Sequence, residues 1–305
     1  EWLRGKVLAS IQSRFKVEDK GPLQWFLGMM VTHSKVEGTL TLSMKASMLD
    51  KIKQFGLESV KPVKTPLKQK QAKGDDGLLS ETDATLFRSM VGCLTWYMLA
   101  RPDIMGATSE CTTSMHAPTN RDMAMAIREY AYLKGSIDKL LTYSQEGHRV
   151  ELDMGCAYKS DKGSWSLVTG HVDANLAKPM SQTGLCFKAA GGTVVARTKK
   201  QPVPAIQTYD SELYGWSLAC CAGIWLYMML TEINHLFDYQ LLGGPIVIHG
   251  DNASVVRTVQ EQAISTKARH IALRWYHFMH AIKRKVLEAH WISGKCNPAN
   301  CLSKG

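Results

Sequence analysis

The spacing of hydrophobic positions changes near the middle of the chain. In the first 140 residues most apolar side chains recur at helical spacing, which favours α-helices. Helices are expected over residues 1–14, 44–55, 81–99, 102–115 and 120–134. Two strand-like segments, 25–33 and 39–43, flank the turn Glu37-Gly38. The first half is therefore predicted to be mainly helical with one β-hairpin.

Short strand-like segments, separated by helical stretches, dominate the second half. Strands are expected over residues 165–173, 184–190, 193–198, 245–249 and 286–292, with a tight Gly191-Gly192 turn. Helices are expected over 211–233, 252–262, 266–284 and 298–304. This order predicts a mixed sheet flanked by helices. Periodicity is lost between residues 144 and 163, so the expected domains are 1–147 and 148–305.

The composition fits a folded protein of about two domains, since the chain has 305 residues. Hydrophobic residues make up 45% and charged residues 21%, which excludes a disordered or fibrous protein. The net charge is +10 and is shared by both halves. Such a surface suits a polyanionic partner, although a charge that only maintains solubility is the competing interpretation.

The cysteines and the longest apolar stretch both indicate an intracellular protein. The eight cysteines contain no CxxC pair and are too sparse for a disulfide scaffold. The stretch Trp216–Leu230 is shorter than the ~20 residues of a membrane span, so it predicts a buried helix and no membrane partner. The chain begins at Glu1 without a signal peptide, and we expect a segment of a longer protein in an unspecified compartment.

Three carboxylates of the second half occupy the ends of predicted elements. Asp173 ends a strand, Glu212 opens the long helix, and Asp251 follows an apolar strand. Strand ends and helix starts converge at one sheet edge in such a fold, and oxygen ligands gathered there suit Mg²⁺ or Mn²⁺. Taken singly, Glu212 is better explained as a helix N-terminal charge and Asp251 as an N-cap; taken together in this element order, the three residues favour a metal site.

Short strings occur in a characteristic order along both halves. In the second half they are HVDAN (171–175), SQTG (181–184), RTKKQ (197–201), SELY (211–214), DNAS (251–254), TKARHI (266–271) and NPANCLSK (297–304). In the first half they are FLG (26–28), KTPL (64–67), VGCL (91–94), ARPDI (100–104) and YLKG (132–135). With these strings the second half resembles the ribonuclease H domain of copia-type retrotransposon polyproteins. The first half resembles the preceding palm end, thumb and connection of the reverse transcriptase.

The resemblance implies a ribonuclease H-like fold and a metal-dependent chemistry. Asp173, Glu212 and Asp251 match three of the four metal-binding carboxylates of that family. Its mechanism is two-metal hydrolysis of the RNA strand of an RNA–DNA hybrid, in which one ion activates water and the other stabilises the departing oxygen. The remaining catalytic position is occupied by Asn300, a neutral ligand that should weaken binding of one ion. Asn175 similarly replaces the second aspartate of the family's Asp-x-Asp string.

Basic side chains near these strings are candidates for contacts with phosphates. The expected nucleic-acid-binding residues are Arg197, Lys199, Lys200, Lys267, Arg269 and His270. A solvated basic face is the alternative for each of them. No Tyr-x-Asp-Asp polymerase motif precedes Phe15, so the chain is not expected to synthesise DNA on its own.

Two functional hypotheses follow from these features. In the first, the chain binds RNA or an RNA–DNA hybrid, and its Mg²⁺-dependent hydrolysis of RNA is weakened or lost because of Asn300. A variant of this hypothesis is an active ribonuclease H fragment of a retroelement polyprotein. In the second, it is an inactive, domesticated subunit that binds RNA and other proteins within a ribonucleoprotein such as a ribosome. The three acidic positions favour the first hypothesis, and Asn300 favours the second.

Overall fold

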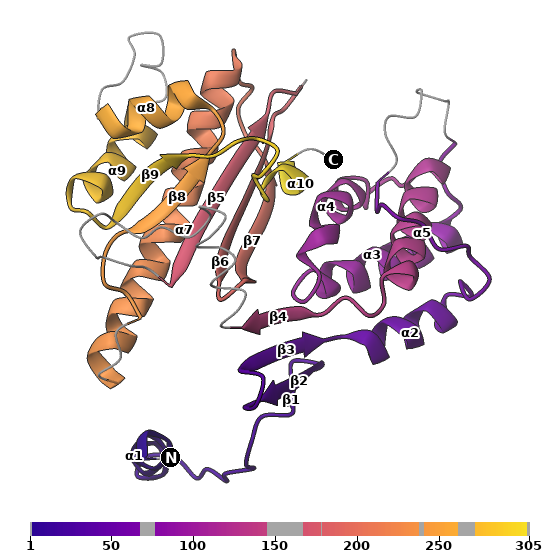
Figure 1. The fold of residues 1–305 in the computed structure, drawn as a ribbon. Helices are drawn as coiled ribbons and strands as arrows, with labels where there is room; N and C mark the ends of the chain where they lie inside the picture. Colours follow the sequence, from indigo (N-terminus) through magenta and orange to yellow (C-terminus); the bar gives the residue numbers. More distant parts are fainter. Residues whose placement is uncertain are drawn as a thin grey trace.

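The computed structural model describes residues 2–67, 77–144, 167–177, 179–237, 241–261 and 272–303. Two separate hydrophobic cores lie in the first and second halves of this part of the chain. The expected domain boundary at residues 147 and 148 lies outside the described residues and stays a prediction. The confirmed fold class is a ribonuclease H-like mixed sheet flanked by helices, preceded by a mainly helical region (Figure 1).

The N-terminal region contains a four-stranded antiparallel sheet where the sequence predicted one hairpin. The strands are β1 (Trp25–Phe26), β2 (Met29–Ser34), β3 (Thr39–Ser43) and β4 (Leu141–Ser144), paired in that order. The predicted strand 25–33 was wrong as a single element, because Leu27 and Gly28 have positive φ angles of 49° and 72°. This two-residue turn folds β1 back onto β2.

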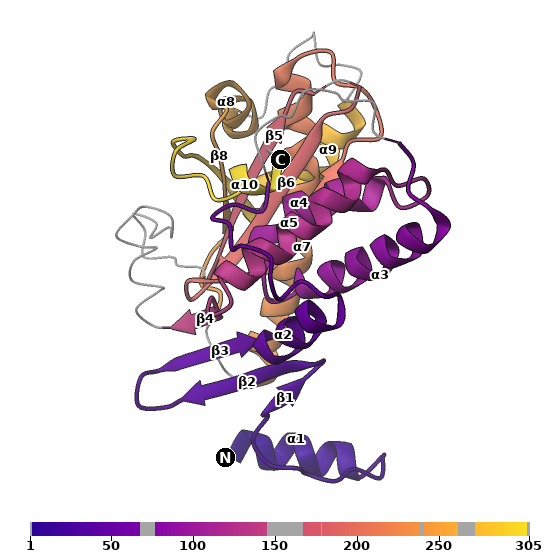
Figure 2. The same cartoon turned by 90° about the vertical axis from the view of Figure 1, so that its right-hand side faces the viewer.

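Strand β4 was missed because it has no local signal of its own. It is four residues long, none of its residues is fully buried, and it pairs with β3 across about a hundred residues of chain. Its far end also reaches the second half, where the Tyr143 hydroxyl donates to the carbonyl oxygen of Thr193 at 2.8 Å. The N-terminal helix α1 (Trp2–Gln12) lies below this sheet, as Figure 2 shows.

The helices of the first half are α2 (Lys45–Gln54), α3 (Glu81–Tyr97), α4 (Met105–Thr113, preceded by the 3-10 turn Pro102–Ile104) and α5 (Asn120–Gly135). They confirm the predicted helices to within a few residues. Helix α5 begins with a capping box in which Thr119 and Asp122 bond each other's backbone N–H groups. Fully buried side chains such as Phe87, Leu94 and Tyr130 join the helices into one core.

The second half forms a five-stranded mixed sheet of the order β7-β6-β5-β8-β9. Its strands are β5 (Val168–Asn175), β6 (Gln182–Ala189), β7 (Gly192–Lys200), β8 (Ile246–Gly250) and β9 (Leu287–Trp291). The first three pair antiparallel, whereas β8 runs parallel to both β5 and β9. The tight turn between β6 and β7 is Ala190-Gly191, one residue earlier than predicted, because these two residues have positive φ angles.

Helices α7 (Thr208–Phe237), α8 (Ala253–Glu261) and α9 (Ala272–Lys283) complete the large core of the second half. Helix α7 packs against β5, β6 and β8 through residues that include Trp216 and Cys220. It is longer than predicted, and Thr208–Leu236 is long and apolar enough to cross a membrane. However, 56% of its most apolar window is buried within the protein, which is typical of a core helix.

The short helix α10 (Asn300–Ser303) lies on the opposite face of the sheet and touches both halves (Figure 1). On one side it packs against β5, β6 and β7, and on the other against α4. A Cβ added to Gly106 of α4 would lie only 2.8 Å from the carbonyl oxygen of Cys301. The absence of a side chain at Gly106 therefore lets the two helices approach closely.

Candidate metal centre

Asp173, Glu212 and Asp251 come together at one end of the second sheet. One carboxylate oxygen from each residue lies within 4.8 Å of one from each of the others. Asp173 and Glu212 are almost fully buried, and Asp251 is half-buried. The convergence expected from the sequence is thus present in the structure, while their catalytic and metal-binding roles stay predictions.

The fold positions each carboxylate through a different element. Asp173 lies near the end of β5, on the face opposite that of the core residue Val172, because successive strand residues alternate in direction. Glu212 belongs to the first turns of α7, whose N-terminus begins at this end of the sheet. Asp251 directly follows the buried strand β8, which pairs in parallel with β5. Parallel pairing brings the two aspartates to the same edge.

The electrostatics of this cluster favour a bound cation. At separations below 4.8 Å, two unit negative charges repel by roughly 3–4 kcal/mol at an effective dielectric constant of about 20. A divalent ion removes this repulsion, and carboxylate oxygens are the ligands that Mg²⁺ and Mn²⁺ prefer. The donor set of the three residues therefore fits a hard divalent cation.

Three histidines form a row across the sheet beside this cluster. His171 of β5, His249 of β8 and His290 of β9 are aligned as cross-strand neighbours, and the rings of His171 and His249 stack at 5.1 Å. Burial above all, with repulsion from His249 and Lys188, lowers the pKa of His171 to about 3. Burial and repulsion from His290 likewise lower the pKa of His249 to about 4. These two imidazoles are neutral at pH 7 and add no positive charge beside the carboxylates.

Asn300 lies beside the cluster and is linked to it through the backbone. Its side-chain amide donates a hydrogen bond to the carbonyl oxygen of Gly294. Gly294 in turn packs against Asp251, so that a Cβ at position 294 would lie 2.9 Å from the Oδ2 atom of Asp251. Asn175, the other departure from the expected aspartates, accepts a hydrogen bond from the backbone N–H of Gln182 at 2.8 Å. That contact closes the connection between β5 and β6.

Ser303 contacts the cluster, and sequence reasoning did not identify this residue as part of the site. Its hydroxyl is fully buried and donates a hydrogen bond to Oδ2 of Asp173. The available signal was its spacing, because Ser303 follows Asn300 by three residues, and such residues share one face of a helix.

The expected nucleic-acid-binding residues do not form one described surface. Arg197, Lys199 and Lys200 are exposed on the edge strand β7. Arg197 is aligned with the core residue Leu185, so it and Lys199 project from the α7 face of the sheet, whereas Lys200 projects from the face of Asp173. Lys267, Arg269 and His270 lie outside the described residues.

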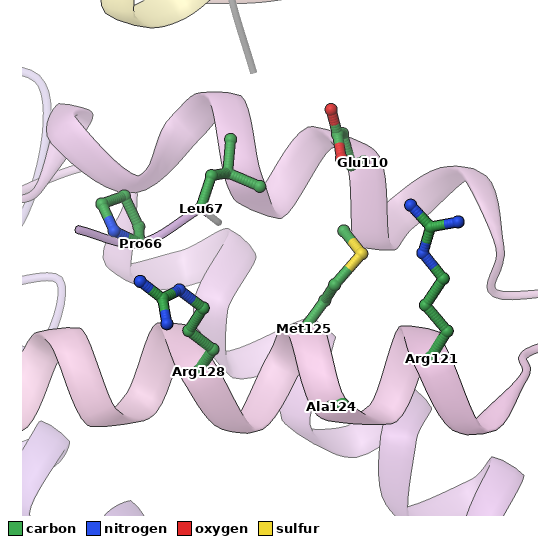
Figure 3. A pocket seen from close by; sticks show the side chains of 7 residues that line it. All are labelled: Pro66, Leu67, Glu110, Arg121, Ala124, Met125 and Arg128. Atoms are coloured by element: carbon green, nitrogen blue, oxygen red, sulfur yellow. The ribbon is translucent and has the colours of Figure 1, made fainter. Parts of the chain in front are cut away.

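Two cavities lie around helices α4 and α5, and the larger of them also reaches the sheet of the second half. One of about 450 Å³ is lined by Lys200 and Gln182 from the sheet and by Glu110 and Arg121 from α4 and α5. A smaller one, of about 90 Å³, lies between α4, α5 and the segment Pro66-Leu67 (Figure 3). Burial raises the pKa of Glu110, although Lys200 and Arg121 oppose this shift. Each cavity is lined by both acidic and basic residues, so neither forms a purely basic surface.

Comparison with known proteins identifies relatives that cover almost the whole chain. A retrovirus-related Pol polyprotein from transposon TNT 1-94 of Nicotiana tabacum is 24% identical over 99% of this chain. The corresponding polyprotein from transposon RE1 of Arabidopsis thaliana is 24% identical over 97%. The chain is homologous to copia-type Pol polyproteins. This confirms the resemblance inferred from the sequence strings.

The chain spans only about a fifth of the length of these relatives: 22% of the Nicotiana tabacum polyprotein and 19% of the Arabidopsis thaliana RE1 polyprotein. An uncharacterized mitochondrial protein of Arabidopsis thaliana is 26% identical over 73% of this chain and 86% of its own length. No family model matches the sequence.

Similar solved structures include an RNase H and a reverse transcriptase. LC11-RNase H1 in complex with an RNA/DNA hybrid is 13% identical and covers 44% of this chain and 92% of its own, with a TM-score of 0.33. The foamy viral protease-reverse transcriptase in complex with dsDNA is 9% identical. It covers 87% of this chain and 46% of its own, with a TM-score of 0.40. At these scores, the fold assignment depends on the strand order of the sheet itself.

Proposed function

We propose that this chain binds an RNA–DNA hybrid and slowly hydrolyses its RNA strand, with a divalent ion held by Asp173, Glu212 and Asp251. The observation that carries the proposal is the convergence of these three carboxylates to within 4.8 Å of one another. Groups of like charge that are largely buried are stable only when a cation or protons compensate them.

The chain's own residues would first hold the metal ion and orient the substrate. Asp173 and Glu212 are almost fully buried, which fixes their positions, while the more exposed Asp251 borders solvent. A bound Mg²⁺ would supply an activated water molecule and stabilise charge that develops on the transferring phosphate. Asn300 cannot add a fourth negative ligand, and for this reason we propose weak rather than brisk hydrolysis.

Contacts with phosphates would come from the edge strand β7. Lys200 is exposed and projects from the same face as Asp173, so it is the best placed of the described basic candidates to bind a strand entering the site. Arg197 and Lys199 would contact phosphates that pass around the sheet edge. The overall charge of +10 supports an affinity for polyanions that decreases with salt.

Cleavage of a labelled hybrid tests this function. The purified chain is incubated with a hybrid whose RNA strand carries a 5′ label, in Mg²⁺ or Mn²⁺, and Asp251→Asn purified in the same way is the control. We expect slow cleavage of the RNA strand that EDTA and Asp251→Asn both abolish. Equal cleavage by Asp251→Asn would overturn the assignment, because the activity would then belong to a contaminant.

A structural RNA-binding role is the second candidate, and Asn300 favours it. The amide of Asn300 donates a hydrogen bond to Gly294, which an ionised aspartate cannot do. A chain that has lost its nuclease activity could bind RNA and proteins of a ribonucleoprotein inside the cell. Tight hybrid or RNA binding without cleavage, even in Mn²⁺, would favour this role.

A further inference from the structure

Ser303 connects the carboxylate cluster with the last described helix. The residue is fully buried, and its hydroxyl donates a hydrogen bond to Oδ2 of Asp173. The carbonyl oxygen of Asn300 lies 3.3 Å from the same hydroxyl. A hydroxyl has only one proton to donate, and a carboxylate is the stronger acceptor. The contact with Asp173 is therefore the principal one.

Helix α10, which carries Ser303, is anchored firmly to the sheet. The carbonyl oxygen of Leu302 accepts hydrogen bonds from Thr198 Oγ1 at 2.9 Å and from Gln182 Nε2 at 3.2 Å. Beneath the helix, a Cβ on Gly184 would lie 2.6 Å from the backbone nitrogen of Ser303. Only a glycine permits this approach, which brings the serine hydroxyl to the level of Asp173 on the neighbouring strand.

The first half of the chain supports the same helix from the other side. Gly106 of α4 approaches the carbonyl oxygen of Cys301 so closely that its Cβ would stand 2.8 Å away. Helix α10 is thus held between β6 and α4.

We propose that Ser303 is a positioning residue for the Asp173 carboxylate, and that α10 makes this position depend on both halves of the chain. The proposal rests on the proposed function in so far as Asp173 is a metal ligand. A carboxylate that receives a fixed hydrogen bond on one oxygen has its plane set, so its second oxygen is presented in one direction. Groups that orient metal ligands in this way commonly change metal affinity by about 10–100-fold when they are removed.

Titration with Mn²⁺ alone tests the positioning role without reference to activity. Isothermal titration calorimetry compares the natural chain with Ser303→Ala and with the matched control Thr198→Val. The control removes a hydrogen bond to the same helix but leaves the contact with Asp173 intact. We expect Ser303→Ala to weaken Mn²⁺ binding by about tenfold and Thr198→Val to leave it unchanged. Equal affinities of Ser303→Ala and the natural chain would overturn the proposal.

A double-mutant cycle in the absence of metal separates this inference from the proposed function. Unfolding by denaturant is measured for the natural chain, Ser303→Ala, Asp173→Ala and the double variant. If Ser303 positions Asp173, the two effects on unfolding free energy are not additive. Additive effects would refute the inference whether or not metal binds. Non-additive effects without detectable Mn²⁺ binding to the natural chain would keep the positioning role and reject the metal-dependent function.

Discussion

The side-chain amide of Asn300 donates a hydrogen bond to the carbonyl oxygen of Gly294, the residue that packs against the Asp251 carboxylate. Through this contact the neutral residue at the fourth acidic position is part of the framework around the cluster. The same side chain thus has a structural role that an aspartate could not take over, since an ionised carboxylate has no proton to donate.

Asn300→Asp is expected to destabilise the metal-free protein and to gain stability from Mn²⁺. The variant loses the bond to Gly294 and adds a fourth negative charge, so we expect the free energy of unfolding to decrease by about 1–3 kcal/mol. Added Mn²⁺ should reduce or reverse this loss, because the new oxygen is a favourable ligand. Denaturant unfolding with and without Mn²⁺ measures both effects. The same loss under both conditions would place Asn300 outside the metal site.

Glu129 should make the stability of the protein depend on pH. Its carboxyl group is buried between α4 and α5, where burial raises its pKa to about 8 despite hydrogen bonds from Thr108 and Cys111. Between the ordinary pKa of glutamate and pH 8, the unfolded chain releases this proton while the folded chain keeps it. The protonated Glu129 therefore contributes fully to stability below the ordinary pKa of glutamate. As the pH rises from there to about 8, this contribution decreases by up to about 1.4 kcal/mol per pH unit.

Glu129→Gln provides the test, because glutamine has nearly the same shape and does not ionise. We expect the variant to be more stable than the natural chain at pH 8 and to show a shallower decrease between pH 5 and pH 8. Chemical unfolding at several pH values provides the comparison. Parallel curves for the two proteins would show that Glu129 is already ionised in the folded state.

Gly106→Ala and Gly92→Ala should have opposite effects on stability. A Cβ at Gly106 collides with the backbone of Cys301, so this variant is expected to lose about 1–3 kcal/mol. Gly92 lies on the exposed side of α3 with no atom within 4 Å of an added Cβ, and alanine there should stabilise the helix by up to about 1 kcal/mol. Thermal unfolding of both variants measures the difference. A neutral effect at Gly106 would mean that α10 is not held tightly by α4.

Lys200→Glu should weaken hybrid binding more than Lys199→Glu does. Both lysines are exposed on β7 and both substitutions change the charge equally, but only Lys200 projects from the face of Asp173. Exposed substitutions of this kind usually alter stability by no more than about 0.5 kcal/mol, so folding should be unaffected. Fluorescence anisotropy with a labelled hybrid at two salt concentrations gives the affinities. Equal effects would indicate binding through general charge alone.

Most of the second half could be predicted from local patterns. The strand β8 is a short apolar run followed at once by Asp251, and the helix α7 begins close to Glu212, so their convergence follows from the element order. The contacts that define the surroundings of the site could not be read in this way. Ser303 meets Asp173 across 130 positions of sequence, and Gly106 meets Cys301 from the other half of the chain. Such contacts depend on tertiary packing, which leaves no periodic signal.

One turn and one short strand of the first half also could not be predicted from local patterns. The segment 25–31 consists of large apolar residues and one glycine, a composition typical of a strand, yet Leu27 and Gly28 form the turn of a hairpin. Strand β4 lacks a buried face and forms only because β3 and β7 lie beside it.

Anomalous scattering from crystals soaked in Mn²⁺ shows whether the three carboxylates hold a divalent ion. We predict a manganese peak at the end of β5, with carboxylate oxygens of Asp173, Glu212 and Asp251 at coordination distances of roughly 2.0–2.6 Å. Asp251→Asn crystals treated identically should show a weaker peak or none. If crystals of the natural chain in saturating Mn²⁺ show no peak among these three residues, or show manganese bound only elsewhere, then Asp173, Glu212 and Asp251 do not form a metal site.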